Sequence, residues 1–238
     1  MPDIIQPFAR FGAADIKDEI YWDGLAECYK RGLVKNVGVS NYGPTLLRRA
    51  QEHLARQGVP LASNQIAFNL LTRRQGSQAT VDAGLEIGVK TMAYYPLAMG
   101  LLTGKLSPQR LQSKNDLRSR DLLRYLQGGS GGTAGLIPKG GISPLLAVLE
   151  EVARGRDKSM AQIALNWIVS KGAIPIPGAS SVEQVQDNIG ALGWRLSKSE
   201  MEQLEEAADK LSFDFSGASF QTTDSKFVGY GFEKWRLD

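Results

Sequence analysis

A repeating pattern of amphipathic segment, glycine and short apolar segment runs along this chain. The joints are Gly32 before LVKNVGVSN, Gly58 before VPLASNQ, Gly88 before VKTMAYYP and Gly172 before AIPIPGA. A glycine just beyond a helix adopts the left-handed conformation that closes the last helical turn. The β-branched and apolar residues that follow each glycine therefore predict a buried strand.

Apolar residues recur at helical spacing in the amphipathic segments. Two such stripes are Leu46, Leu47, Ala50 and Leu54, and Ile163, Ala164, Trp167 and Ile168. Alternation of helices with short apolar strands predicts an α/β fold with a parallel sheet. The first three joints are 26 and 30 residues apart, and the fourth follows 84 residues after the third. We therefore expect a long loop insert over about 106–142.

The expected insert contains a glycine cluster and several arginines. The spacing Gly129-x-Gly131-x-x-Ala134 matches a dinucleotide-binding fingerprint by letter, but no strand is evident before it and no helix after it. We interpret this stretch as a flexible loop. The arginines could hold a 2′-phosphate through paired hydrogen bonds, or they could form a solvated basic loop. They are Arg110, Arg118, Arg120 and Arg124.

Three short sequences in the C-terminal part predict capping boxes, in which a serine and a Gln or Glu close the start of a helix. They are Ser159-x-x-Gln162, Ser181-x-x-Gln184 and Ser197-x-x-Glu200. The helix expected after Ser197 has an apolar stripe that ends at Leu211. Residues 212–238 then form a tail with seven aromatic residues, which we expect to pack on this fold or on a partner.

Polar residues stand where four successive strands are expected to end. They are Ser40 with Asn41, Asn64 with Gln65, Tyr94 with Tyr95, and the stretch 178–180. In parallel α/β barrels, functional groups project from the C-terminal ends of the strands. Each of these residues could serve only the turn that leaves its strand, but four polar ends in succession favour a binding site.

Composition and charge exclude several other classes of protein. The chain has 238 residues, of which 42% are hydrophobic and 22% are charged, as in ordinary globular proteins. The 28 basic and 25 acidic residues give a net charge of +3, too small to indicate a nucleic-acid or membrane partner. No apolar run approaches the roughly 20 residues of a membrane span.

A single cysteine, Cys28, excludes an internal disulfide and a cysteine-based metal site. We predict no metal site, and we expect a reducing compartment, either the cytoplasm or an organelle stroma. Residues 1–3, Met-Pro-Asp, open no recognisable signal or transit peptide, so we expect no targeting signal in this chain.

Two segments, YYPLAMGLLTGK at 94–105 and IPGASSVEQVQDN at 176–188, resemble the cofactor-binding half of the aldo-keto reductase family. With Ser40 and Asn41 upstream, the resemblance covers about residues 21–211. It implies about strands four to eight of a TIM-type (β/α)8 barrel, with a C-terminal helix and the aromatic tail. We expect one partial barrel domain over 1–238, with a core at 21–211. Five strands cannot close a barrel, so the open edges favour a protein partner.

The resemblance implies NADPH as cofactor and a small carbonyl compound as substrate. Ser40, Asn41 and Gln65 would hold the nicotinamide carboxamide, and Tyr94 would stack on the nicotinamide ring. The remaining residues would hold the pyrophosphate and the adenosine end of the dinucleotide. They are Pro96, Leu97, Gly100 and the nearby Lys105 for the pyrophosphate, and Gly178, Ser180, Gln184, Asp187 and Asn188 for the adenosine end.

Two positions depart from the family pattern. Tyr95 stands where serine usually follows the stacking aromatic residue. Asp187 stands where glutamate is usual, which shortens the reach of the carboxylate toward the adenine. Gln184 also has a competing role, because it belongs to one of the predicted capping boxes.

The catalytic tetrad of the family (Asp, Tyr, Lys and His) has no counterpart in this chain. The family histidine precedes a helix that resembles residues 21–25, YWDGL, but the stretch 3–8, DIIQPF, has no histidine. The only histidine, His53, lies in a helical segment and is expected at the surface. We therefore assign no catalytic residue.

Three hypotheses follow. The chain represents the C-terminal part of an NADPH-dependent aldo-keto oxidoreductase that reduces aldehydes or ketones to alcohols. Alternatively, it is a non-catalytic relative that docks on a partner through an open barrel edge and the aromatic tail. A third reading is a fragment without a stable fold. On the first two readings, this chain alone is expected to catalyse carbonyl reduction poorly, because positioned proton donors contribute about 10²–10⁴-fold.

Overall fold

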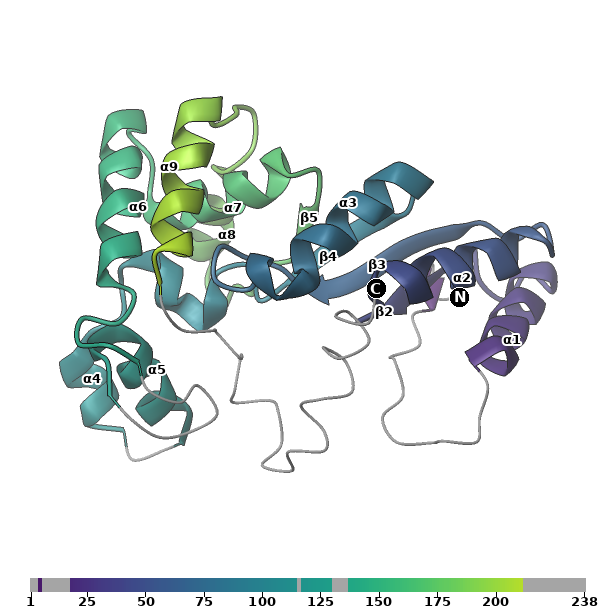
Figure 1. Ribbon diagram of the computed structural model, residues 1–238, viewed down its shortest axis with the longest axis horizontal. Helices are drawn as coiled ribbons and strands as arrows, with labels where there is room; N and C mark the ends of the chain where they lie inside the picture. The colour runs from purple at the N-terminus through teal and green to yellow at the C-terminus, as the bar shows by residue number, and fades with distance from the viewer. Residues whose placement is uncertain (1–3, 6–17, 115–116, 130–136, 212–238) are drawn as a thin grey trace.

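Five parallel strands form one sheet whose spatial order follows the order of the chain. The computed structural model describes residues 4–5, 18–114, 117–129 and 137–211 (Figure 1). The strands are β1 (Ile4–Ile5), β2 (Asn36–Ser40), β3 (Leu61–Ala67), β4 (Lys90–Tyr94) and β5 (Ile174–Pro175). The prediction of an α/β fold with parallel strands is confirmed.

Nine α-helices and two short helical turns accompany these strands within the described residues. The helices are α1 (Asp18–Lys30), α2 (Pro44–Ala55), α3 (Gln78–Ile87), α4 (Pro108–Gln112), α5 (Leu117–Gln127), α6 (Ser143–Arg156), α7 (Met160–Ser170), α8 (Val182–Ile189) and α9 (Lys198–Asp209). The turns are the π-helical η1 (Arg73–Ser77) and the 3₁₀-type η2 (Ala98–Thr103).

The glycine that follows each predicted helix is left-handed, as expected. The φ angles are 69° at Gly32, 73° at Gly58, 77° at Gly88 and 82° at Gly172. After each glycine, the next backbone N–H donates to the carbonyl five residues earlier, for example Val89 N to Gly84 O at 2.8 Å. This bond pairs a carbonyl that the helix end would otherwise leave unsatisfied. The chain then enters a strand.

The fourth strand of this series is much shorter than predicted. The stretch AIPIPGA forms only β5, which pairs with β4 at Met92 and Ala93. One more ladder bond joins Ile176 N to Ala93 O at 3.0 Å. Pro175 and Pro177 have no N–H to donate, so the regular ladder ends early.

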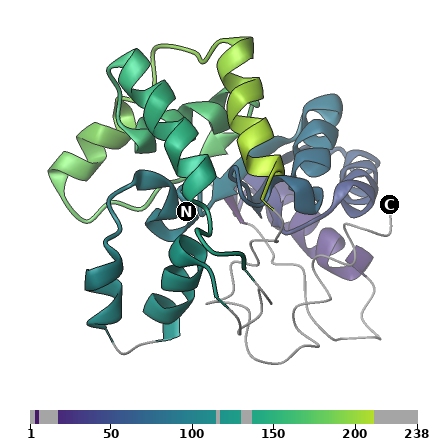
Figure 2. The ribbon, with the colours of Figure 1, turned by 60° about the vertical axis from the view of Figure 1, so that its left-hand side comes forward.

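The expectation of a loop throughout 106–142 is wrong, because this segment contains α4 and α5. Leu122 and Tyr125 are almost fully buried on α5, and their spacing makes one apolar face among the arginines. The two helices lie side by side below α6 in both views (Figure 1 and Figure 2). Gly129 forms a bridge with Ile137, whereas Gly131 and Ala134 lie outside the described residues.

Two of the three predicted capping boxes are complete. Ser159 caps α7 with Gln162, and Ser197 caps α9 with Glu200. The third predicted box, Ser181-x-x-Gln184, is only half formed. Ser181 caps α8 by accepting from Gln184 N at 3.3 Å, but the Gln184 side chain accepts from Ser180 N at 2.7 Å instead of returning to the cap.

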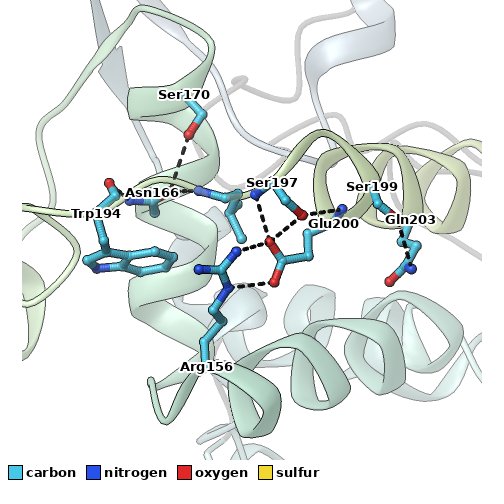
Figure 3. Close-up of polar contacts among 9 residues, drawn as sticks. Arg156, Asn166, Ser170, Trp194, Ser197, Ser199, Glu200 and Gln203 are labelled. Atoms are coloured by element: carbon cyan, nitrogen blue, oxygen red, sulfur yellow. Dashed lines mark hydrogen bonds and ion pairs between the residues drawn. The ribbon is translucent and has the colours of Figure 1, made fainter.

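Helices α6, α7 and α9 pack into the larger of two apolar clusters, where the Phe68 and Trp167 rings lie 5.0 Å apart. Figure 3 shows two polar contacts that hold this part together. Arg156, at the end of α6, donates two hydrogen bonds of 2.6 and 2.5 Å to the Glu200 carboxylate. Asn166 on α7 is fully buried and binds the chain between α8 and α9.

The smaller cluster packs α1 and α2 against β2 and β3. His53 joins the two helices, since its Nε2 lies 2.7 Å from Asp23 Oδ1 and its ring lies 5.3 Å from Trp22. The side chain is 24% exposed, so the expected surface histidine is half-buried, because the packing of α1 against α2 covers much of its ring. The aromatic tail at 212–238 lies outside the described residues, and its packing stays a prediction.

Candidate functional site

The register of the sheet brings the predicted polar strand ends to one edge. Ser40 lies opposite Gln65, and Ala67 lies opposite Tyr94. On the other side of β4, Pro175 lies opposite Ala93, so the stretch 178–180 leaves β5 at the same edge. In parallel α/β folds this carboxyl edge is where ligands bind.

Hydrogen bonds connect four of the predicted site residues directly. Ser40 Oγ and Asn41 N each donate to Gln65 O at 2.9 Å. The Tyr94 hydroxyl donates to Asn41 Oδ1 at 3.0 Å. The ends of β2, β3 and β4 therefore form one fixed polar cluster, in which Ser40 and Asn41 are buried and Gln65 and Tyr94 are half-buried.

Tyr94 remains a neutral phenol at physiological pH. Burial raises the pKa of its hydroxyl to about 12, with a smaller contribution from the neighbouring Tyr95. The Tyr94 and Tyr95 rings meet edge to face, with centroids 4.9 Å apart. Tyr95 thus supports the orientation of the Tyr94 ring from the position where serine is usual in the family pattern.

Left-handed backbone is concentrated at this edge. Five described residues other than glycine have a positive φ, and four of them follow β2 or β4. They are Asn41, Tyr95, Ala98 and Met99, with φ of 57°, 52°, 47° and 58°. The left-handed region costs a non-glycine residue about 1–2 kcal/mol, and such strain gathers at ligand clamps and active sites.

The strained turn after β4 is held in place by its own buried residues. Asn69 Nδ2 donates to Tyr95 O at 2.9 Å. Pro96 and Ala98 are buried, Leu97 is half-buried, and Gly100 has a φ of 96°. Buried side chains and a hydrogen bond from Asn69 therefore fix the shape of this turn. The role of Asn69 could not be read from the sequence, since asparagine after a strand equally marks an ordinary turn.

The residues expected at the adenosine end lie on and before α8. Gly178, Ser180 and Gln184 are exposed, and Asn188 is half-buried. Gln184 Oε1 accepts from both the backbone N–H and the hydroxyl of Ser180, at 2.7 and 3.1 Å. These contacts fold the start of α8 onto itself and engage the Gln184 side chain locally.

Asp187 faces the protein with both carboxylate oxygens. Its Oδ2 lies 3.1 Å from Lys105 Nζ, and its Oδ1 accepts from Ser159 Oγ at 2.7 Å. Gln162 Nε2 also donates to the Asp187 backbone carbonyl at 3.0 Å. Sequence reasoning found Ser159 and Gln162 only as a helix cap. No sequence signal linked them to α8.

Within the described ranges there is no group of three His, Cys, Asp or Glu side chains that could hold a metal ion. The described helices are also too short or too polar to cross a membrane.

Comparison with known proteins places these features in one family. The model of the Aldo/keto reductase family matches residues 6–209. "Pyridoxal reductase, chloroplastic" from Arabidopsis thaliana is 41% identical over 209 residues, which are 88% of this chain and 53% of that protein. "L-glyceraldehyde 3-phosphate reductase" from Escherichia coli K12 is 32% identical over 170 residues, 71% of this chain and 47% of that protein. The chain spans about half the length of these relatives.

Solved structures show the same fold. The aldo-keto reductase of Bombyx mori in complex with NADP has a TM-score of 0.59 at 20% identity, over 86% of this chain and 56% of that chain. A thermostable aldo-keto reductase in complex with the inhibitor epalrestat has a TM-score of 0.59 at 22% identity, over 86% and 60%. The five parallel strands are therefore part of a TIM-type barrel, and the chain belongs to the aldo/keto reductase family.

Proposed function

We propose that the carboxyl edge of the sheet binds NADPH, and that the chain is the cofactor-binding part of an oxidoreductase that reduces aldehydes or ketones to alcohols. The observation that carries this proposal is the concentration of left-handed residues after β2 and β4, beside polar side chains that are already fixed. A site whose shape is fixed by contacts within the protein loses little conformational entropy on binding.

The described residues suit a nicotinamide dinucleotide. The Ser40 hydroxyl and the amides of Asn41 and Gln65 offer donors and acceptors of the kind that a carboxamide needs. Tyr94 offers an aromatic ring, and the Lys105 ammonium suits a phosphate. When bound, NADPH would supply a hydride for the carbonyl. Support for this cofactor comes from the family and from the solved Bombyx mori protein in complex with NADP.

None of these site residues is a suitable donor of the proton that carbonyl reduction requires. The Tyr94 hydroxyl has a pKa of about 12 and donates to Asn41. We therefore assign Tyr94 to cofactor binding and not to acid catalysis. The names of the relatives, pyridoxal reductase and L-glyceraldehyde 3-phosphate reductase, support an aldehyde as substrate. The name "chloroplastic" of the first supports a plastid stroma as one compartment.

A second candidate is a non-catalytic subunit that docks on another polypeptide. Val182, Val185 and Ile189 point outward from α8 at helical spacing, with exposures of 68%, 45% and 59%, and α8 has no buried residue. Among the described strands, β5 pairs only with β4 and also exposes Ile174. A partner that pairs with β5 and also covers α8 would bury these exposed side chains.

Titration of purified chain 1–238 with NADPH, followed by calorimetry or by nicotinamide fluorescence, tests the first candidate. We expect saturable binding that Tyr94→Ala abolishes and that Tyr29→Ala, on α1 and away from the edge, leaves unchanged. Addition of an aldehyde should give slow or no oxidation of NADPH. Absence of binding at millimolar NADPH by a cooperatively folded chain would reject the site. Purification of a stoichiometric complex that β5 and α8 substitutions disrupt would favour the second candidate.

A further inference from the structure

Lys105 and Asp187 join two segments that both belong to the proposed cofactor site. Lys105 ends the segment after β4, and Asp187 lies in the last turn of α8. Their charged groups are 3.1 Å apart. Both residues were expected to contact the dinucleotide, yet here they neutralise each other.

The two partners of this ion pair are held very differently. Asp187 is fixed by Ser159 Oγ at 2.7 Å and, through its backbone carbonyl, by Gln162 Nε2 at 3.0 Å. Ser159 is also the N-cap of α7, so the carboxylate lies at a helix N-terminus, where negative charge is favoured. The side chain of Asp187 is 24% exposed, whereas that of Lys105 is 69% exposed.

Lys105 is therefore the partner that can leave. An ion pair with one mostly exposed member contributes little to stability, so its opening costs little. Lys105 also directly follows Gly104, whose φ is 68°. The pyrophosphate of a dinucleotide carries two negative charges where a carboxylate carries one, and its oxygens are strong acceptors for the lysine ammonium.

We propose that Asp187 is an internal competitor of the dinucleotide for Lys105, and not a ligand of the adenosine. In the free protein Lys105 pairs with Asp187. On binding, its ammonium passes to a phosphate of the dinucleotide, while Asp187 stays with Ser159 and Gln162. Asp187 thus lowers affinity by no more than the small free energy of this ion pair. This inference rests on the proposed binding of NADPH.

A double-mutant cycle on NADPH affinity tests the competition. We expect Asp187→Asn to tighten binding about 2- to 5-fold, since an amide still accepts from Ser159 but no longer attracts Lys105. Lys105→Met should weaken binding about 10-fold. The double variant should match Lys105→Met alone, because Asp187 acts only through Lys105. Glu183→Gln, which removes the same charge elsewhere on α8, should leave affinity unchanged.

The outcomes separate this inference from the proposed function. Weaker binding by Asp187→Asn, whether or not Lys105 is present, would make Asp187 a direct ligand and overturn the competition. Asp187→Asn could also tighten binding equally in the Lys105→Met background. That result would overturn the competition, because the Asp187 charge would then repel the anionic dinucleotide directly and not act through Lys105. Absence of NADPH binding by the wild type and by Asp187→Asn alike would instead reject the proposed function itself.

Discussion

The Tyr94 hydroxyl donates a 3.0 Å hydrogen bond to Asn41 Oδ1, which joins β4 to the residue after β2 across the end of β3. Burial raises the pKa of Tyr94 to about 12 from its ordinary 10.0. Because the folded protein favours the neutral phenol, this contribution to stability is complete below pH 10. It is lost as the pH rises through about 12.

Tyr94→Phe should separate the hydrogen bond from the ring. We expect the free energy of unfolding to fall by about 1 kcal/mol, the usual contribution of one hydrogen bond, while NADPH affinity changes no more than a few-fold. Urea denaturation and NADPH titration measure the two effects. A loss of binding as large as that of Tyr94→Ala would show that the hydroxyl, and not the ring, serves the cofactor.

Ala98→Gly should relieve strain in the turn after β4. Glycine accepts a φ of 47° freely, which offsets the loss of about 0.8 kcal/mol for one buried methyl group. We expect the free energy of unfolding to stay within about 0.5 kcal/mol of wild type or to rise. NADPH affinity should fall a few-fold because the free turn becomes less ordered.

Ala79→Gly is the matched control, since Ala79 is exposed in α3 and has ordinary helical geometry. There we expect a loss of about 1 kcal/mol, the usual helix penalty of glycine. Equal losses at both positions in urea denaturation would mean that the turn stores no strain.

Glu200→Gln should alter the acid stability of the protein. The two hydrogen bonds from Arg156 lower the pKa of Glu200 from 4.5 to about 2 (Figure 3). A lowered folded pKa gives stability that is present above the unfolded pKa and is lost as the pH falls toward 2. We expect the variant to be less stable by on the order of 2 kcal/mol at pH 6.

Thermal unfolding from pH 6 to pH 2 measures this effect, and the gap between wild type and Glu200→Gln should close across that range. Glu202→Gln is the control, since the ion pair of Glu202 with Lys198, at 3.6 Å, is exposed. A gap that persists at pH 2 would assign the effect to packing and not to charge.

Asn166→Ala should be among the most destabilising single changes on α7. Asn166 Nδ2 donates to Ala191 O and Trp194 O, and its Oδ1 accepts from Leu196 N, at 2.8, 2.9 and 3.0 Å. Removal leaves buried backbone groups unpaired, which should cost about 3 kcal/mol. Ser170→Ala, which removes one half-buried hydrogen bond to Asn166, should cost less than about 1 kcal/mol. If Asn166→Ala cost no more stability than Ser170→Ala, water would be replacing the Asn166 amide as the hydrogen-bond partner of these backbone groups.

The strands and their order could be predicted because the relevant signals are local. A left-handed glycine after an amphipathic helix stops the helix by its own conformation, as at Gly88. Helix α5 was missed because its apolar residues, Leu122 and Tyr125, alternate with arginines over a short segment. The shortness of β5 follows from Pro175 and Pro177, whose effect on hydrogen bonding outweighed the apolar character of the stretch.

Only part of the candidate site could be predicted from the sequence, because strand register places some of its residues and helix packing places the others. The meeting of Ser40, Asn41, Gln65 and Tyr94 follows from strand register, which parallel pairing of successive units dictates. The partners of Asp187 do not follow from any local pattern, because Lys105 is 82 residues and Ser159 is 28 residues away in the chain. Side-chain pairing at that separation depends on how α7 and α8 pack.

The agreement between strand order and chain order bears on how the protein is made. Strands β1 to β4 each pair with the next strand to be synthesised, so this part of the sheet can form progressively during translation. Strand β5 begins 80 residues after β4 ends, at Ile174. Pairings distant in sequence form slowly. The edge of β4 that pairs with β5 therefore stays unpaired while α4 to α7 are synthesised. A nascent chain is most exposed to misassociation during that interval.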